Sequence, residues 1–193
     1  MKWFLSLLVA FLFFACHSSR EDERLSNGNS KENEALKSRL FQIEERDGLL
    51  AVTAVNPLDP NSEEKYILHS KPAERGNSIG FRIKYPAEKV VCLSTSHIGF
   101  INAIDAGNRI AGSRNADLIY SEKLREKYSS GKLQSVGGAE LNLEKLVALD
   151  ADVVFASVYD AGGMEEVEKM RKLGIPVVLV SEFLEEQPLR RAE

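Results

Sequence analysis

The residues best suited to chemistry in this chain of 193 residues follow a short apolar run. Four small or polar side chains, Ser94, Thr95, Ser96 and His97, come directly after the apolar residues 90–93. A serine and a histidine three residues apart could act as nucleophile and base, but no GxSxG motif surrounds this serine. A serine at the start of a helix is usually a cap. We therefore expect no catalytic residue here and no enzyme.

Three roles are open for His97. It could bind zinc or manganese, contact an organic ligand or chelate, or stand at a helix start without any ligand. Protein zinc sites normally use three or four protein ligands. This part of the sequence offers no second histidine and only scattered acidic residues. We therefore expect no metal site, while the other two roles stay open.

Further polar or glycine-rich corners follow other predicted strands. They are Gly137-Gly138, Tyr159-Asp160-Ala161-Gly162-Gly163 and Ser181-Glu182-Phe183. Paired glycines could let the backbone approach a ligand or could form plain turns, and both interpretations stay open. No GxGxxG motif follows the first predicted strand and no GK[ST] motif is present, so neither dinucleotide binding nor a P-loop is expected.

Strand and helix patterns alternate after Pro86. Predicted strands cover residues 89–94, 109–113, 134–136, 151–157 and 175–181, and predicted helices cover 98–106, 121–128, 143–149 and 164–173. Gly107 is expected to end the first helix, and Gly174 with Pro176 the last one. This alternation is typical of an α/β fold, a Rossmann-like lobe with a parallel sheet and flanking helices.

The polar corners are expected to share one edge of that sheet. Parallel strands bring their carboxyl ends together, and ligands bind beyond those ends. The predicted ligand cleft consists of Ser94, Thr95, Ser96, His97, Gly137, Gly138, Tyr159, Asp160, Glu182 and Phe183. Cys92 lies inside the apolar run, which indicates a small buried side chain and not a reactive thiol.

Residues 38–87 are predicted to form a small antiparallel β extension before the lobe. The predicted strands are 40–44, 49–55, 66–69 and 81–85, with a turn at Asp47-Gly48, a stop at Asn56-Pro57 and a loop at 71–76. His69 has no second histidine or cysteine nearby, so a partly exposed strand residue is expected and not a metal ligand.

The first fifteen residues are predicted to be an export signal. A positively charged start precedes the apolar run 4–15, which is too short to span a bilayer comfortably. The segment Phe13-Phe14-Ala15-Cys16 resembles the lipobox of bacterial lipoproteins, although Phe13 stands where the family usually has leucine. The resemblance implies cleavage before Cys16 and its acylation, which would attach the exported chain to a membrane on the periplasmic or cell-surface side. The alternative is an ordinary signal peptide with an incidental cysteine.

Residues 16–37 are charged and polar without an apolar period, so we predict a flexible tether. The whole chain is 44% hydrophobic and 28% charged, which fits one globular domain with additional residues at its ends. Its net charge is −4 and it has no long basic run, so nucleic acid is not expected as a partner.

The region 88–193 resembles the N-terminal lobe of periplasmic binding proteins that serve ABC importers of iron-siderophore complexes, haem and vitamin B12. The resemblance depends on four pieces: KVVCLSTSHIGFINAIDAGNRIAGS (89–113), LQSVGGAELNLEKLVALDADVVFAS (133–157), RKLGIPVVLVSEF (171–183) and the ending EEQPLRRAE. The second piece is the most specific. The upstream β region resembles the extension found in lipoprotein members of this family.

The resemblance implies a two-lobed clamp that holds a ligand in its cleft and docks on a permease with its ATPase. The ligand would be an iron chelate, haem or cobalamin, and no cofactor is implied. By motif position, Glu144 would pair with permease arginines. A carboxylate in the first turn of a helix also complements the helix dipole, so this second interpretation stays open.

The family's binding proteins are nearly twice as long, and this sequence ends where their lobe-connecting helix begins. A truncated binding protein is therefore expected, with weak ligand binding because a cleft needs two walls. The alternatives are a lipoprotein that serves as an interaction module outside transport, or a non-functional remnant.

Overall fold

Two β-sheets organise the computed structural model, which describes residues 40–46, 49–70 and 80–186. All of these residues belong to one compact unit, Ser38–Glu193. The predicted signal peptide, Cys16, the tether, the Asp47-Gly48 turn and the loop 71–76 lie outside the described residues. Within the described ranges, no helix has the length and apolar character needed to span a membrane.

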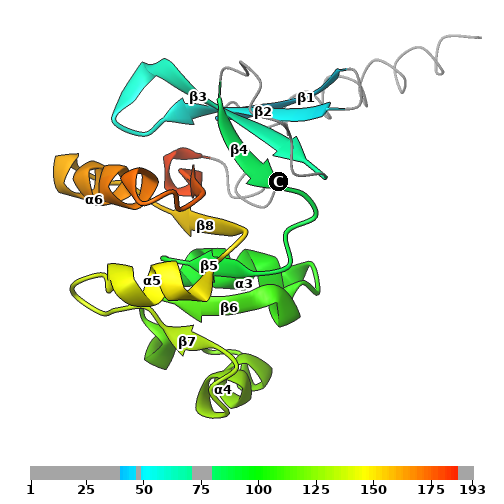
Figure 1. Cartoon of the computed structure of the whole chain (residues 1–193). Coiled ribbons are helices and arrows are strands. Elements are labelled where there is room, and N and C mark those ends of the chain that lie inside the picture. The colour runs from blue at the N-terminus through cyan, green and yellow to red at the C-terminus, as the bar shows by residue number, and fades with distance from the viewer. Residues whose placement is uncertain (1–39, 47–48, 71–79, 187–193) are drawn as a thin grey trace, which may run out of the picture. The chain divides into compact units, whose positions relative to one another are not determined.

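The larger sheet is parallel throughout, as the alternating pattern predicts. Its five strands are β5 (Val90–Cys92), β6 (Ile110–Ser113), β7 (Gln134–Ser135), β8 (Val153–Ala156) and β9 (Val177–Leu179). They lie in the order β7-β6-β5-β8-β9, and every neighbouring pair is parallel (Figure 1). The α/β fold class is therefore confirmed.

Helices cover both faces of this sheet. They are α3 (Thr95–Ala103), α4 (Glu122–Ser129), α5 (Leu143–Leu149) and α6 (Ala161–Lys172), with 3-10 turns η1 (Gly107–Arg109), η2 (Ala116–Leu118) and η3 (Glu182–Leu184). Val90 and Cys92 pack in one core cluster with residues of α3 and α4, whereas Val91 packs in a second cluster with residues of α5 and α6. Because successive strand residues point to opposite faces, the two helix pairs lie on opposite faces.

The smaller sheet contains β1 (Phe41–Arg46), β2 (Leu49–Asn56), β3 (Asp59–His69) and β4 (Phe81–Lys84) in that order. The strands β1, β2 and β3 are antiparallel, as predicted, but β4 pairs parallel to β3. The predicted strand 66–69 is too short, because β3 begins at Asp59. Asn56 does end β2, and its side-chain oxygen accepts a hydrogen bond from Leu58 N at 2.9 Å in the turn to β3. His69 is half-buried in β3.

Helix caps explain two errors in the predicted boundaries. Ser94 and Asp160 each accept a hydrogen bond from an N–H in the following turn, so α3 and α6 both begin three residues before the predicted starts. Gly162 and Gly163 are therefore helical, and neither a plain turn nor a loop cradle describes them. Gly107 does not end α3, which stops at Ala103. Asp105 takes the left-handed conformation there with φ 58°.

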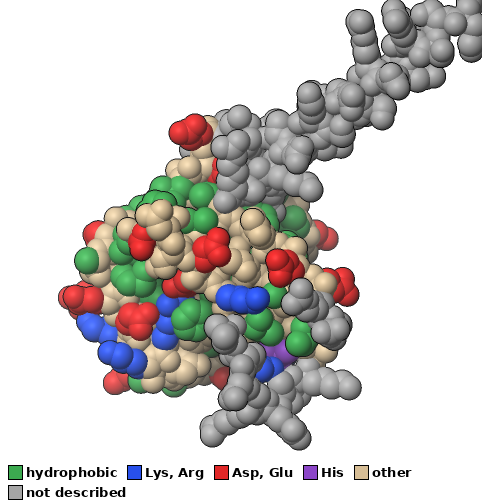
Figure 2. Space-filling model, turned by 90° about the horizontal axis from the view of Figure 1, so that it is seen from above, with side chains coloured by type: hydrophobic (Ala, Val, Ile, Leu, Met, Phe, Trp, Pro, Cys, Tyr) green, Lys and Arg blue, Asp and Glu red, His purple; other side chains and the backbone are tan. Residues whose placement is uncertain are grey.

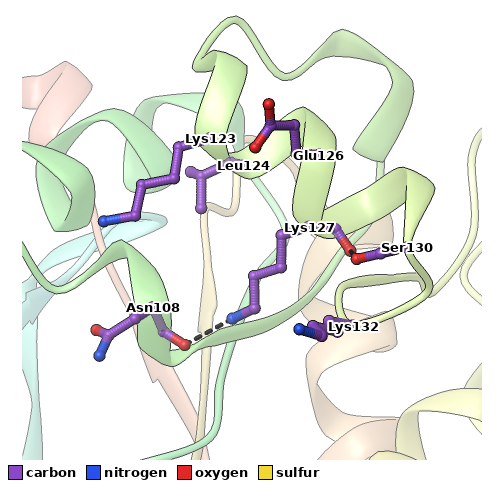
Figure 3. A pocket seen from close by; sticks show the side chains of 7 residues that line it. All are labelled: Asn108, Lys123, Leu124, Glu126, Lys127, Ser130 and Lys132. Atoms are coloured by element: carbon purple, nitrogen blue, oxygen red, sulfur yellow. Dashed lines mark hydrogen bonds between the residues drawn. The ribbon is translucent and has the colours of Figure 1, made fainter.

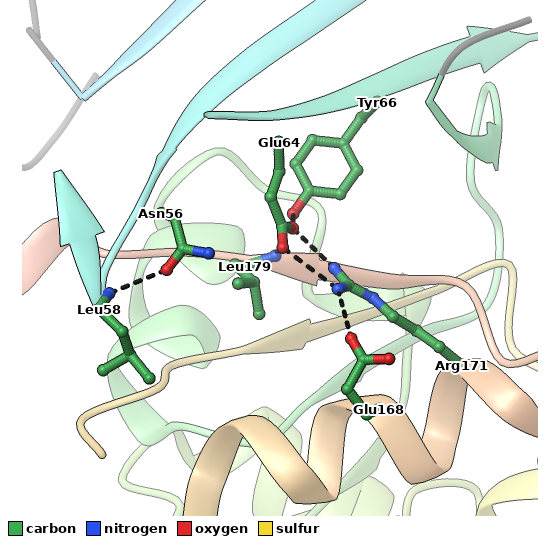
Figure 4. Close-up of polar contacts among 7 residues, drawn as sticks. All are labelled: Asn56, Leu58, Glu64, Tyr66, Glu168, Arg171 and Leu179. Carbon is green, nitrogen blue, oxygen red and sulfur yellow. Dashed lines mark hydrogen bonds and ion pairs between the residues drawn. The ribbon is translucent and has the colours of Figure 1, made fainter. Parts of the chain in front are cut away.

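A polar cluster connects the two sheets (Figure 4). Arg171 of α6 contacts both carboxylate oxygens of Glu64 in β3, at 3.2 and 2.6 Å, and its guanidinium lies 3.9 Å from the centre of the Phe81 ring. Tyr66 donates its hydroxyl hydrogen to Glu64 and accepts a hydrogen bond from Leu179 N at 2.9 Å. Burial, followed by the negative charge of Glu64, raises the pKa of the Tyr66 hydroxyl, which therefore stays protonated.

A second connection lies where the extension enters the lobe. One carboxylate oxygen of Asp152, just before β8, accepts hydrogen bonds from the backbone N–H groups of Glu88 and Lys89 at 2.7 and 2.9 Å. The other oxygen lies 2.9 Å from Lys84 Nζ. Burial raises the pKa of the Asp152 carboxyl, but these contacts outweigh burial and the pKa lies below its ordinary value. Asp152 therefore fixes the start of β5 against the start of β8.

Candidate functional site

The corner after β5 begins the candidate site. Ser94 is the N-cap of α3, and its hydroxyl oxygen accepts a hydrogen bond from Ser96 N at 3.3 Å. The two serine hydroxyls lie 2.8 Å apart. Thr95, Ser96 and His97 form the first turn of α3 and not a loop, because the cap satisfies the start of the helix. This corner therefore holds two hydroxyl groups in fixed positions at the carboxyl end of the central strand.

His97 is almost completely buried, with 3% of its surface exposed. Its Nε2 atom lies 3.1 Å from Ser157 Oγ and 3.6 Å from Glu182 Oε2. The ring packs edge-on against Phe155 at a centroid distance of 6.3 Å. Its Nδ1 atom has no hydrogen-bond partner among the described residues. His97 thus joins the ends of three elements, α3, β8 and η3.

Glu182 stands at the start of η3 and completes the cluster. Its Oε1 atom accepts a hydrogen bond from Ser96 Oγ at 2.6 Å, across 86 positions of sequence. Burial raises the pKa of the Glu182 carboxyl, but the contacts with His97 and Ser96 lower it by more, so the pKa lies below its ordinary value of 4.5. Glu182 is therefore a carboxylate at neutral pH. Ser94, Ser96, His97, Ser157 and Glu182 are called the strand-end cluster below.

We expect Glu182→Gln to lower the free energy of unfolding by about 1 kcal/mol at pH 7, because charge-assisted hydrogen bonds are lost. The depressed pKa means that the carboxylate stabilises the fold above pH 4.5 and that this contribution is lost as the pH falls through the folded value. Urea unfolding of both proteins from pH 7 to pH 3 measures the difference, which should shrink toward acid. Glu186→Gln removes an exposed carboxyl nearby and serves as the control. A difference that is constant over this pH range would contradict the prediction.

An aromatic pair lies next to the strand-end cluster. The rings of Tyr159 and Phe183 are 4.5 Å apart between centroids with an interplanar angle of 38°. Tyr159 is 67% exposed, so its ring offers an aromatic surface to a ligand. Asp160 instead turns to its own helix, where Oδ1 accepts a hydrogen bond from Gly163 N at 2.8 Å. Asp160 is thus used as the cap of α6.

Gly137 and Gly138 lie at the end of β7, the strand at the opposite side of the sheet from β9. Four strand spacings separate them from Glu182, a distance of roughly 19 Å along the sheet edge. Gly137 has φ 146° and is needed for a tight turn, in which Gly138 N donates to Glu140 O at 3.1 Å. The structure therefore brings the predicted residues after β5, β8 and β9 together and leaves this glycine pair at a distance.

Sequence patterns missed two residues at this edge. Ser157 ends the run of β8 and contacts His97, and Arg114 follows β6 and forms an ion pair with Glu166 of α6. Ser157 is the last residue of one predicted strand, as Ser94 is of another, and Arg114 directly follows a third. The rule that found Ser94 would therefore also have found them. Cys92, directly before this edge, is fully buried, and burial raises the pKa of its thiol to about 12, as expected for an unreactive side chain.

A pocket lined by three lysines lies away from the strand ends (Figure 3). It has a volume of about 440 Å³ and involves Lys123, Lys127 and Lys132. Lys127 Nζ donates hydrogen bonds to the backbone oxygens of Asn108 and Ile110 at 2.6 and 2.7 Å. This amine stabilises the start of β6, at the edge opposite the strand-end cluster. Across the described ranges, no three His, Cys, Asp or Glu side chains come together as metal ligands would.

The fold is that of a parallel-sheet lobe whose polar residues gather at the strand ends, and the chain is similar to periplasmic binding proteins. The petrobactin-binding protein of Bacillus subtilis is 18% identical, with 68% of this chain and 38% of that chain covered at a TM-score of 0.44. The vitamin B12 binding protein of Vibrio cholerae is 22% identical over 50% of this chain and 35% of that chain, with a TM-score of 0.40. The molybdate-binding protein of Haemophilus influenzae is 24% identical over 51% and 31%, with a TM-score of 0.42.

An uncharacterized lipoprotein of Methanocaldococcus jannaschii is 26% identical in an alignment 145 positions long, which covers 67% of this chain and 34% of that protein. This chain thus spans about a third of the length of its curated relative. No protein-family model matches the sequence. The resemblance to periplasmic binding proteins is confirmed as a similarity, and these proteins bind different ligands: vitamin B12, petrobactin and molybdate.

Proposed function

We propose that this chain is the substrate-binding lipoprotein, or part of one, of an ABC import system, a binding protein and not an enzyme. The observation that carries the proposal is the strand-end cluster, in which Ser96, His97 and Glu182 from distant segments meet at one edge of a parallel sheet. Ligands of such sheets bind outside the carboxyl ends of the strands. Within the cluster, Ser157 Oγ lies 3.1 Å from His97 Nε2, but the same nitrogen also faces Glu182 Oε2 at 3.6 Å and the ring is almost completely buried. We therefore assign this contact to structure and not to catalysis.

The ligand class is a metal chelate with a flat or partly apolar surface, such as a ferric siderophore, haem or cobalamin. The exposed ring of Tyr159, which packs against the half-buried Phe183, supports this part of the proposal, because an exposed aromatic ring can stack on a flat organic surface. The serine hydroxyls of the cluster can hydrogen-bond oxygen atoms of a chelate. Binding of this kind needs no metal ligand from the protein, since the chelator coordinates the metal.

Calorimetric titration with a ferric siderophore, haemin and cobalamin tests the ligand class. One of the three should give a saturating signal, and Tyr159→Ala should weaken its binding about tenfold through loss of stacking. Tyr120→Ala removes another exposed tyrosine and should leave binding unchanged. If the folded chain binds none of the three at about 0.1 mM, the proposed ligand class is wrong.

Export and anchoring complete the proposal. Acylation of Cys16 would attach the chain to a membrane on the periplasmic or cell-surface side, and the name of the archaeal relative, a lipoprotein, supports this assignment. Glu144 would meet the permease. Its side chain is exposed in the first turn of α5, whose N-cap Asn142 accepts a hydrogen bond from Lys145 N at 2.9 Å. An exposed charge at such a position mainly steers encounter with a partner of opposite charge.

Charge reversal of Glu144 tests the docking role. We expect Glu144→Arg to lower the association rate with a permease in detergent or nanodiscs about tenfold, while chelate affinity stays unchanged. Surface plasmon resonance at low and high salt measures the rate. Glu165→Arg makes the same charge change at an exposed position of α6 and should have little effect. Equal association rates for the two variants would contradict a docking role for Glu144. The interaction of its carboxylate with the helix dipole would then be its remaining function.

A further inference from the structure

A second cavity lies between the smaller sheet and the face of the parallel sheet covered by α3. Its volume is about 460 Å³, which is within the range of small-molecule sites. Its walls are apolar and include Val52, Ala54, Phe100, Ile101, Phe155 and Val178. None of Ser94, Ser96, Tyr159 or Phe183 lines it, so this apolar pocket lies beside the proposed chelate surface and does not coincide with it. His97 and Glu182 belong to both.

One end of the apolar pocket is polar. It is lined there by His97, Ser181, Glu182 and Glu185, and the described residues contribute no lysine or arginine to the lining. Ser181 and Glu185 are 8% and 6% exposed. Three buried atoms at this end, His97 Nδ1, Ser181 Oγ and Glu182 Oε2, have no hydrogen-bond partner among the described residues. Buried polar atoms normally have hydrogen-bond partners. His97 Nδ1 and Ser181 Oγ therefore call for a partner from outside the described residues, and Glu182 Oε2 has only its 3.6 Å contact with His97 Nε2.

The chemistry of the two ends defines the molecule that would fit. The apolar walls favour a hydrocarbon or aromatic body, since burial removes its surface from water. The polar end offers the Glu182 carboxylate and an imidazole nitrogen, and a carboxylate accepts hydrogen bonds without donating any. A protonated amine supplies up to three donors and compensates the negative charge.

We propose that the apolar pocket binds a small amphipathic amine, with its ammonium group against Glu182 and Ser181 and its apolar body between β2 and α3. This site does not depend on the proposed transport function. A second copy of this chain or an apolar segment of a protein partner would present backbone and mixed side chains to the pocket. A single small cation reaches the polar atoms of His97, Ser181 and Glu182 more directly.

Titration of the purified full chain with octylamine, octanol and octanoate tests the proposal, because the three probes share one apolar body. Octylamine should bind at least tenfold more tightly than octanol, and octanoate should bind most weakly. Glu182→Gln should reduce the affinity for octylamine to that for octanol. Ala54→Leu should abolish binding of all three by filling the pocket, whereas Ala139→Leu, at an exposed position outside it, should not. Circular dichroism establishes that each variant is folded.

Three results would overturn the proposal. Equal affinities for octylamine and octanol would show that the polar end of the pocket does not recognise an ammonium group. Absence of binding of all three probes at about 1 mM would exclude a small-molecule site of this class. A concentration-dependent dimer that Ala54→Leu dissociates would assign the pocket to a second copy. Tyr159→Ala separates the two proposals, because it should weaken chelate binding and leave octylamine binding unchanged. Failure of one therefore does not imply failure of the other.

Discussion

Arg171→Met lowers the free energy of unfolding by about 3 kcal/mol, because it leaves the Glu64 carboxylate poorly compensated between the two sheets. The side chains of Arg171 and Glu64 are 9% and 12% exposed, so water replaces the lost contacts only in part. The guanidinium also gives up its position over the Phe81 ring. Urea unfolding, followed by circular dichroism, measures the change.

A double-mutant cycle separates the charge pair from the packing around it. Replacement of both partners, Glu64→Leu with Arg171→Met, should cost less than the sum of the single changes, since no charge is left unpaired. Lys172→Met removes an exposed charge from the end of the same helix and should cost less than about 0.5 kcal/mol. If Arg171→Met is as stable as Lys172→Met, the cluster in Figure 4 does not hold the extension on the lobe.

Gly137→Ala should have a similarly large effect. We expect it to lower the free energy of unfolding by about 3 kcal/mol or to prevent folding. Gly137 has φ 146°, a conformation that side chains with Cβ rarely adopt. A Cβ atom at this position would lie 2.3 Å from the backbone oxygen of Glu140 and 2.9 Å from Leu141 Cα. Both are backbone atoms, so a rotamer change cannot relieve the clash. Thermal unfolding measures the effect.

The neighbouring glycine supplies the matched control. Gly138 has no atom within 4 Å of an added Cβ, so Gly138→Ala should change the free energy of unfolding by less than about 0.5 kcal/mol. Equal losses in the two variants would mean that the turn geometry is not the cause. The same pair addresses the question left open for the two glycines, because Gly138→Ala should affect chelate binding only if this corner approaches the ligand.

Some elements were predictable because local signals agree. Helix α5 was predicted with both of its bounds, since the cap Asn142 precedes a short apolar period and Asp150 ends it in the left-handed conformation. The order of strands and helices in the lobe followed from the alternating patterns. The predicted helix starts were too late where polar residues fill the first helical turn. In α3, for example, Thr95 and Ser96 resemble loop residues in a sequence.

The smaller sheet was harder to predict. The first half of β3 carries Pro60, Glu63 and Glu64 and is mostly exposed, so it lacks the apolar pattern of a strand. The parallel pairing of β4 with β3 was missed because apolar alternation does not encode strand direction.

The candidate site was predictable in its parts and not in its contacts. The strand-end rule selected Ser96, His97 and Glu182, but the hydrogen bond between Ser96 and Glu182 joins segments 86 positions apart. Nothing local specifies such a contact. The rule also grouped Gly137 and Gly138 with them, because it states which edge a residue occupies and not how far along that edge it lies. The apolar pocket depends on two sheets that meet through tertiary packing, so no single stretch of sequence predicts it.

The position of Tyr66 has a consequence for the solubility of the chain. Among the described strands, β9 is at the border of the parallel sheet, and an outward-facing N–H on such a strand can pair with a strand from another molecule. The backbone N–H of Leu179 instead donates a hydrogen bond to the Tyr66 hydroxyl, so a strand from another molecule cannot pair with β9 at Leu179. Glu64 and Arg171 hold the phenol in place, and Figure 2 shows acidic and basic side chains interspersed among apolar ones on the surface. The small sheet therefore covers part of this strand border as well as enlarging the core.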